Sequence, residues 1–432
     1  LVLIHLSVFF IAGLACHGRL AAERPDREHL TEFYFWISLG GVTGGMFNAL
    51  LAPLMFTGIA EYPVTVVAGC LLRPTPNRTS AASSRWTWLP RLVLPLLPAL
   101  ITASAALFLI PRIDLPFPVR MALLFGAPLI VVFFTVDVPW RFSLSLAGVL
   151  AASSFSTDGH GQTLFAERNF FGVLRVTRDP DGPFRRLVHG STLHGRQFLD
   201  PARQCEPLSY YHSSGPLHYI FKVAQNVSGC GNVAVVGLGV GSTACYSRPD
   251  QDWTFYEINP AVVKIAQNTN YFTLLNGCMK ARNSRIILGD ARLRIRDAHP
   301  EQYEFILLDA FSSDSIPTHL LTREAVELYL SKLSPDGLLA FHISNRTLNL
   351  QPVLGDLAAS LGLICYGFNE TEINPLHAAE GKDSSHWLVM ARDTESLGNL
   401  PKYDTWSPVA PREEPEIWTD DYSQILSILN WN

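Results

Sequence analysis

Residues 232–257 read NVAVVGLGVGSTACYSRPDQDWTFYE, and this stretch decides the fold of the second half of the chain. Two apolar runs, 232–236 and 253–257, flank a segment that begins with a glycine-rich turn. The turn carries Gly237, Gly239 and Gly241. Short apolar runs bounded by glycine are typical of interior strands in a parallel sheet. The stretch therefore predicts two neighbouring strands and a turn whose backbone can approach a ligand closely, because glycine has no Cβ.

The same alternation of strands and helices continues along the chain. Further strands are predicted at 284–288, 305–308 and 337–343, and helices at 208–224, 259–268, 325–333 and 353–361. Alternation of this kind indicates a parallel sheet with right-handed crossovers. Upstream, residues 162–189 read as short strands with an Asp-Gly hairpin signal. We therefore predict a Rossmann-like α/β domain preceded by a small β unit.

Carboxylates follow the predicted strands at the edge where such sheets bind ligands. Glu257 ends the second strand about 20 residues after the glycines, where it can accept hydrogen bonds from both hydroxyls of a ribose. Asp290 follows the third strand and is placed to accept one from an adenine amino group. The spacing GLGVG differs from the GxGxxG of dinucleotide sites and is the tighter form seen for S-adenosyl ligands. The pattern predicts an S-adenosylmethionine-dependent methyltransferase fold, with S-adenosylmethionine or its decarboxylated form as co-substrate.

Composition divides the chain further. Its 432 residues exceed one ordinary domain, and long apolar runs dominate the first 155. We predict a multi-span helical membrane domain at 1–155, a small β-rich unit at 156–222, the Rossmann-like domain at 223–395 and a C-terminal tail at 396–432. The net charge of −5 comes without a basic patch, which argues against nucleic acid as a partner.

Three apolar stretches of the first domain are long enough to cross a bilayer, which takes about 20 residues. They are 33–56, 89–111 and 117–136. Residues 1–16 are interpreted as the tail of another segment, so that the first membrane segment is incomplete. Arginines gather at 19–27 and 73–85, and the positive-inside tendency places both loops in the cytoplasm. The lipid bilayer is therefore an expected partner.

The seven cysteines are scattered and form no CxxC pair. This spacing argues against a zinc cluster or a redox dithiol, and no metal is expected. An odd, dispersed set of cysteines predicts a reducing compartment.

Several motifs together resemble the aminopropyltransferases, the family of spermidine and spermine synthases, and in particular its bacterial membrane-fused members. The matching segments are SYYHSSGP, VVGLGVGS, FYEINPAVVKIA, LGDAR and FILLDAFSSDSIPTHLLTREAVELY. They cover roughly residues 167–345. The resemblance implies transfer of an aminopropyl group from decarboxylated S-adenosylmethionine to a polyamine such as putrescine. It also implies a multi-pass protein of the bacterial inner membrane with a cytoplasmic catalytic domain.

The resemblance assigns roles to individual residues. Glu257 would hold the ribose, and Asp290 with Ala291 the adenine. Asp309 and Asp314 match the acids of the family's catalytic loop, while Tyr211 and His212 match a Tyr-His pair that lines the active site. A diamine is a dication, so its pocket needs carboxylates, and the attacking nitrogen must lose a proton. Other residues expected to line the pocket are Thr192, His194, Gln197, His342 and Asn345.

Two positions depart from the family. Val240 stands where the glycine loop usually carries an acid, and Ser213 where an acid usually follows Tyr-His. Two alternatives therefore stay open. One is an S-adenosylmethionine-dependent methyltransferase, and the other is a membrane sensor or transporter that binds a polyamine or nucleoside without turnover. Assembly into a homo-oligomer also stays open.

Overall fold

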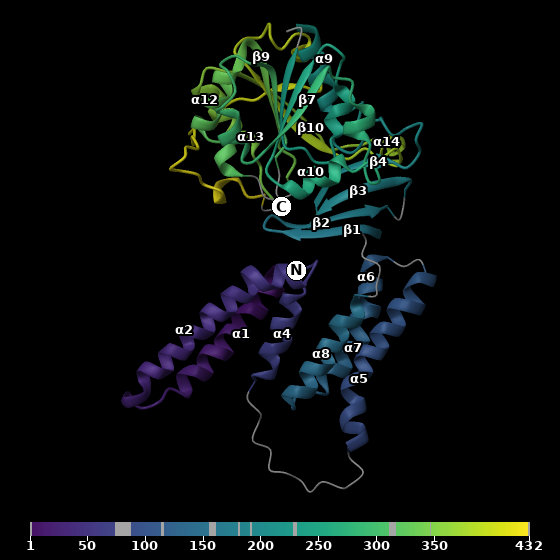
Figure 1. Cartoon of the computed structure of the whole chain (residues 1–432), viewed down its shortest axis with the longest axis vertical. Helices are drawn as coiled ribbons and strands as arrows, with labels where there is room; N and C mark the ends of the chain where they lie inside the picture. Colours follow the sequence, from purple (N-terminus) through teal and green to yellow (C-terminus); the bar gives the residue numbers. More distant parts are fainter. Residues whose placement is uncertain are drawn as a thin grey trace. The chain divides into compact units, whose positions relative to one another are not determined.

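The computed structural model describes residues 2–73, 88–113, 116–154, 161–179, 182–190, 192–227, 231–310, 317–345 and 347–430. The chain forms two compact units, residues 1–159 and residues 160–432. Figure 1 shows that the first unit is helical, whereas the second combines helices and strands. The composition had placed this boundary after residue 155.

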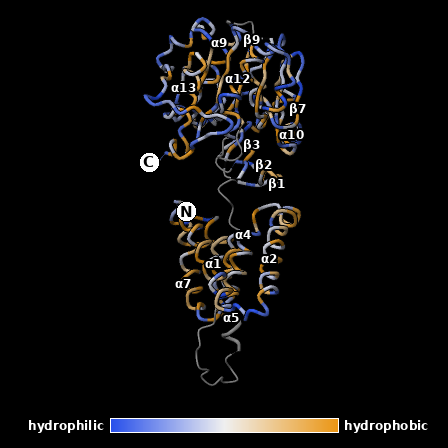
Figure 2. Tube along the Cα trace, turned by 90° about the vertical axis from the view of Figure 1, so that its left-hand side faces the viewer, coloured by the Kyte–Doolittle hydropathy of each residue, from blue (hydrophilic) through white to orange (hydrophobic). Residues whose placement is uncertain are grey.

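The first unit is built from apolar helices. They are α1 (Val2–Ala22), α2 (Leu30–Met46), α3 (Ala52–Met55), α4 (Glu61–Leu71), α5 (Trp88–Ser104), α6 (Phe117–Met121), α7 (Ala127–Phe133) and α8 (Pro139–Ser153). Helix α8 packs against α4, α5 and α7. Many large apolar side chains remain exposed, with Phe9 74% and Leu54 84% accessible. Figure 2 shows hydrophobic residues recurring along these helices.

Two helical stretches, Leu3–Ala22 and Arg27–Met55, are long and apolar enough to cross a membrane by length and composition alone. The second contains most of the span predicted at 33–56, and the first extends beyond the segment predicted at 1–16. The spans predicted at 89–111 and 117–136 correspond to shorter apolar helices, Val93–Leu109 and Pro118–Phe133. Large exposed apolar surfaces mark contact with lipid or protein.

The second unit begins with a small antiparallel sheet. Its strands are β1 (Gln162–Asn169), β2 (Gly172–Arg178), β3 (Phe184–His189) and β4 (Thr192–Phe198), and they pair in chain order. Helix α9 (Pro216–Val227) then leads to an eight-stranded sheet. The sheet order is β12-β10-β11-β9-β8-β5-β6-β7.

Five strands of the large sheet are parallel, and β10, β11 and β12 join antiparallel at one side. The strands are β5 (Asn232–Val236), β6 (Asp252–Glu257), β7 (Asn283–Leu288), β8 (Tyr303–Leu308), β9 (Leu333–His342), β10 (Ile364–Glu370), β11 (Ser385–Ala391) and β12 (Ser407–Pro408). The other helices are α10 (Pro260–Gln267), α11 (Ala291–Ile295), α12 (Arg323–Lys332), α13 (Gln351–Ser360) and α14 (Pro375–Ala379).

Both faces of the large sheet are covered by helices (Figure 1). Val233 and Val235 of β5 belong to one buried cluster with residues of α9 and α10. Ala234 and Val236 point the other way and pack with residues of α12 and α13. Side chains alternate between the two faces of a strand, so burial on both faces requires an uninterrupted apolar run. This is why the sequence NVAVV predicted an interior strand correctly.

The structure corrects one predicted helix and adds a pair of strands that was not predicted. The helix predicted at 208–224 begins only at Pro216, because proline fits the first turn of a helix and follows a turn at Gly215. The antiparallel pair β10–β11 was not predicted. The C-terminal segment predicted at 396–432 packs against the rest of the second unit, since β12 pairs with β10 and Trp418 is 1% exposed within the core.

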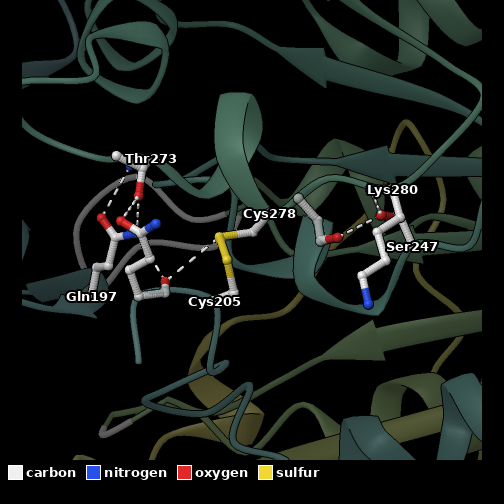
Figure 3. The surroundings of a disulfide bond; sticks show 8 residues. Gln197, Cys205, Ser247, Thr273, Cys278 and Lys280 are labelled. Carbon is white, nitrogen blue, oxygen red and sulfur yellow. Dashed lines mark hydrogen bonds between the residues drawn. A yellow bond between two sulfur atoms is a disulfide. The ribbon is translucent and has the colours of Figure 1, made fainter. Parts of the chain in front are cut away.

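A disulfide links the segment that follows β4 to the segment that precedes β7 (Figure 3). Cys205 lies in the turn after β4, and Cys278 ends a helical turn that precedes β7. Beside the disulfide, Gln197 Nε2 donates to Thr273 Oγ1 at 2.7 Å. Disulfides persist in oxidising compartments, so this pairing does not fit the predicted reducing compartment. The spacing gave no signal because the two cysteines are 73 residues apart and meet only in the fold.

Replacing both Cys205 and Cys278 with serine is expected to lower the free energy of unfolding by about 2–4 kcal/mol, because the cross-link restricts the unfolded chain. The measurement is thermal unfolding of the full chain in detergent, with and without dithiothreitol. The reductant should lower the melting temperature of the wild-type protein and leave the double variant unchanged. An equal effect of the reductant on both proteins would contradict the prediction.

Candidate active site

The turn after β5 lies backbone to backbone against two neighbouring segments. Gly237 has a φ of +95°, and a Cβ there would collide with the carbonyl oxygen of Asp309. Gly239 has a φ of +53°, and a Cβ there would lie 2.8 Å from the carbonyl oxygen of His194. Only glycine fits both the conformation and the contact. The turn forms one wall of a cavity at the carboxyl ends of the parallel strands, called here the strand-end cavity.

Glu257 lines the strand-end cavity and is 8% exposed. Its carboxylate accepts hydrogen bonds from the backbone N–H groups of Leu238, at 3.0 Å, and Asn259, at 2.8 Å. Burial raises the pKa of Glu257, although the backbone hydrogen bonds oppose this shift. Each carboxylate oxygen can accept a second hydrogen bond, so both remain able to receive a hydroxyl of a ribose.

Asp290 and Ala291 also line the cavity, at the start of α11. Asp290 Oδ1 caps the helix by accepting from Leu293 N at 3.0 Å, while Oδ2 lies 3.1 Å from His319 Nε2. The carboxylate thus combines the helix-cap role with a position facing the cavity. His319 lines the cavity as well.

Asp309, at the end of β8, is the centre of a buried hydrogen-bond network. Oδ2 accepts a hydrogen bond from the hydroxyl of Tyr211, and Oδ1 lies 2.7 Å from His342 Nδ1. The side chains of Asp309 and His342 are each 4% exposed. His342 Nε2 lies 2.7 Å from Ser344 Oγ, which accepts from His386 N at 2.8 Å. The network therefore fixes the orientation of Asp309 at the cavity wall.

Aromatic packing and a strained backbone support this network. The ring of His342 stacks between Tyr210 and Trp387, with centroid distances of 4.3 and 4.5 Å. Burial and the Asp309 carboxylate raise the pKa of Tyr211 well above its usual range, so its hydroxyl remains a donor. Ser209 has a φ of +59° and is fully buried, with its hydroxyl donating to Asp383 at 2.6 Å. Such outliers persist only where the surroundings hold them.

The structure brings together most of the predicted site residues. The strand-end cavity is lined by Gly237, Gly239, Glu257, Asp290, Ala291, Asp309 and Tyr211. Gly241 and His212 do not line it: Gly241 begins a 3₁₀ helix, and His212 Nδ1 lies 2.9 Å from Ser214 Oγ. Asp314 lies outside the described residues.

The two positions that depart from the resembled family lie in different surroundings, one buried and one exposed. Val240 is 1% exposed, and its side chain would meet a Cβ built at Gly195 at 2.5 Å. It points into the core rather than into the cavity. Ser213 is exposed and does not line the cavity.

Some cavity residues were not predicted. Asn259 lines the cavity, accepts from Ala261 N at 3.0 Å through Oδ1, and has a buried Nδ2 without a hydrogen-bond partner. An unpartnered buried amide is costly, which makes this nitrogen available to a ligand. The sequence around His319 and Phe171 carried no motif that would have predicted their position in the cavity.

Of the other predicted lining residues, His194 lines the cavity, while Thr192, His342 and Asn345 line a second cleft and Gln197 lines neither. Among the described residues, no group of three or more potential metal ligands was found.

Comparison with curated proteins gives two relatives. A polyamine aminopropyltransferase from Vibrio vulnificus is 37% identical over 112 residues, which make up 25% of this chain and 36% of that protein. An N-terminal histidine N-methyltransferase from Emericella nidulans is 26% identical over 345 residues, or 71% of this chain and 58% of that protein. The chain thus spans less than two thirds of either relative. The second match exceeds the length of residues 160–432, so it includes part of the helical unit. No known family profile matches the chain.

Solved structures give distant likenesses. The spermidine synthase from Thermotoga maritima shares 11% identity at a TM-score of 0.39, covering 60% of this chain and 82% of its own. A SAM-dependent methyltransferase from Archaeoglobus fulgidus shares 12% identity at a TM-score of 0.27, covering 41% of this chain and 95% of its own.

Proposed function

We propose that this protein is a membrane-anchored transferase that uses an S-adenosyl sulfonium as donor and an amine as acceptor. Aminopropyl transfer from decarboxylated S-adenosylmethionine is the first reaction to test. The observation that carries the proposal is that three acids line one cavity at the carboxyl ends of parallel strands: Glu257 ends β6, and Asp290 and Asp309 follow β7 and β8, in the sheet order β8-β5-β6-β7. The partial similarity to a polyamine aminopropyltransferase supports it, and makes a polyamine such as putrescine the reference acceptor to test.

Each residue of the strand-end cavity has its own role in the proposed reaction. Glu257 would bind the ribose and Asp290 the adenine, with the Nδ2 of Asn259 as a further donor. Asp309 accepts the proton that the acceptor nitrogen loses as the nitrogen–carbon bond forms. The bound donor supplies a sulfonium, whose carbon–sulfur bond breaks with its electron pair going to sulfur. Tyr211 and His342 hold Asp309 in place, so positioning together with one base suffices.

Methyl transfer from S-adenosylmethionine is the second candidate. The specific observation in its favour is Val240, whose buried side chain faces Gly195 instead of the cavity, where the resembled family places an acid for the aminopropyl amine. The N-methyltransferase relative, whose match includes part of the helical unit, also supports it.

The products distinguish these reactions. The full chain, purified in detergent, is incubated with an amine and either decarboxylated S-adenosylmethionine or S-adenosylmethionine, and nucleosides are separated by chromatography. Methylthioadenosine from the decarboxylated donor is the expected result. Formation of S-adenosylhomocysteine from S-adenosylmethionine would instead support methyl transfer, the second candidate. Donor binding without either product would favour a sensor or transporter.

Attachment to the bacterial inner membrane is part of the proposal. It is supported by the two long apolar helices and the exposed apolar side chains of the first unit. The test is fractionation of cells that express the full chain, followed by a carbonate wash of the membranes. A spanning protein stays in the pellet, whereas recovery in the wash would contradict the proposal.

A further inference from the structure

A second cavity, called here the polar cleft, lies over the other half of the sheet edge. It is lined by residues of β3 and β4, by the segment after β9, by the end of β10 and by the start of β11. Tyr210 and His194 line both this cleft and the strand-end cavity. His342, the partner of Asp309, lines the cleft while Asp309 lines the cavity. A molecule in the cleft would therefore lie next to the proposed base.

The carboxylates of the polar cleft already have cationic partners. Glu370 Oε1 lies 2.6 Å from Lys382 Nζ, and these side chains are 13% and 4% exposed. Asp383 Oδ2 lies 3.0 Å from Arg196 and also accepts from Ser209. Both acids among the described lining residues are thus neutralised from within the protein. A dication placed here would meet no free carboxylate pair, and burying unmatched charge is costly.

The cleft does offer unpartnered hydrogen-bonding atoms. Glu370 Oε2, Ser385 Oγ and His386 Nε2 are buried, line the cleft and have no hydrogen-bond partner. Ser385 is only 3% exposed. Burial lowers the pKa of His386 to about 4, so its ring is neutral near neutral pH. Buried polar groups are nearly always hydrogen-bonded, so these three atoms are placed to receive a polar ligand.

The rest of the wall combines uncharged polar side chains with apolar ones such as Val188 and Leu348, and its further charged residue, Arg186, is paired with Asp179. It includes the side-chain amides of Asn345, Asn349, Gln351 and Asn369. Amide and hydroxyl groups pair well with neutral donors and acceptors and add no charge.

We propose that the polar cleft binds the acceptor, and that this acceptor is a monoamine whose other polar groups are uncharged amides or hydroxyls, not a free diamine. The inference rests on the proposed function, because it assumes transfer to an amine. The single amine reaches Asp309, which takes one proton as the new nitrogen–carbon bond forms and the carbon–sulfur bond of the donor breaks. The neutral remainder of the acceptor occupies the hydrogen-bonding positions around Ser385.

Putrescine and N-acetylputrescine provide a matched pair of probes, because they share a carbon chain and differ by one charge and one amide. With the full chain in detergent and the donor that supports turnover, kcat/KM is expected to be at least about tenfold higher for N-acetylputrescine, since its second end carries no charge to be buried. Equal values, or a preference for putrescine, would overturn the inference and leave the proposed function intact.

A charge variant provides the second test. Lys382→Gln frees the Glu370 carboxylate, so the KM for putrescine should fall about tenfold while that for N-acetylputrescine should not fall. Arg196→Gln, which frees Asp383 at another point of the wall, should act in the same direction and serves as the test if Lys382→Gln fails to fold. Unchanged preference in a folded variant would contradict the inference. Donor binding is measured in parallel by calorimetry. Turnover of putrescine without turnover of N-acetylputrescine overturns this inference, whereas absence of donor binding, or of turnover with either amine, overturns the proposed function.

Discussion

Replacing Asp309 with asparagine is expected to lower kcat by about 100- to 10,000-fold, the range typical of a lost general base. Asparagine has nearly the same shape, but it cannot take a proton from the acceptor nitrogen. It also presents an amide where the carboxylate now accepts from Tyr211 and faces His342. The measurement is the rate of nucleoside product formation at saturating donor and amine.

Donor affinity is the internal control for this variant, because Glu257 and Asp290 are unchanged. Calorimetry should give a dissociation constant close to that of the wild-type protein. A variant that retains wild-type kcat would exclude Asp309 as the base, and one that loses donor binding would indicate a structural defect instead.

His342→Gln tests the positioning role. Removing the imidazole leaves Oδ1 of the Asp309 carboxylate without its ring partner, so the carboxylate is no longer held toward the acceptor nitrogen. The kcat should therefore fall by about 100-fold while the dissociation constant of the donor stays unchanged, a split that a general structural defect would not produce.

The sequence could predict those strands whose apolar pattern follows directly from their buried position in the sheet. The strands at 232–236, 253–257, 284–288 and 305–308 were predicted within one or two residues, because interior strands covered on both faces are continuous apolar runs. The β10–β11 pair was missed, because its strands are joined through α14 instead of a short turn, and because β11 pairs with β9 only in the folded sheet. The cross-link between Cys205 and Cys278 was missed for the same reason, since it depends on two distant turns meeting.

The sequence could predict those site residues that lie at the carboxyl end of a predicted strand. Glu257, Asp290 and Asp309 each end a strand, and parallel strands bring such residues to one edge. The partners of these acids could not be predicted, because His319 and His342 come from segments remote in sequence. His342 was expected to line the pocket, but only the structure shows that its ring contacts Asp309 directly. The charge pairing of the polar cleft depends likewise on Glu370 meeting Lys382 in space.

Glu257→Gln is expected to weaken donor binding by about 10- to 100-fold, the cost of losing hydrogen bonds to a charged group. The carboxylate accepts from two backbone N–H groups while facing the cavity. Glutamine keeps only one acceptor oxygen, so its amide N–H₂ group must face either a backbone N–H or a ribose hydroxyl. Calorimetry with methylthioadenosine measures this loss, and unchanged affinity would remove Glu257 from the site. Asp290→Asn is the matched control, because it should alter the adenine end while leaving the ribose contact in place.

The pH dependence of donor binding follows from the same carboxylate. Burial raises the pKa of Glu257, so the side chain takes up a proton at a higher pH than an exposed glutamate. A protonated carboxyl donates one hydrogen bond and loses part of its accepting capacity. Affinity should therefore be highest above this raised pKa and fall as the pH is lowered through it. The Glu257→Gln variant cannot titrate at this position, so its affinity should change less over the same range. If both proteins lose affinity in parallel on acidification, the pH dependence belongs to another group, and Glu257 does not bind the donor through its ionised form.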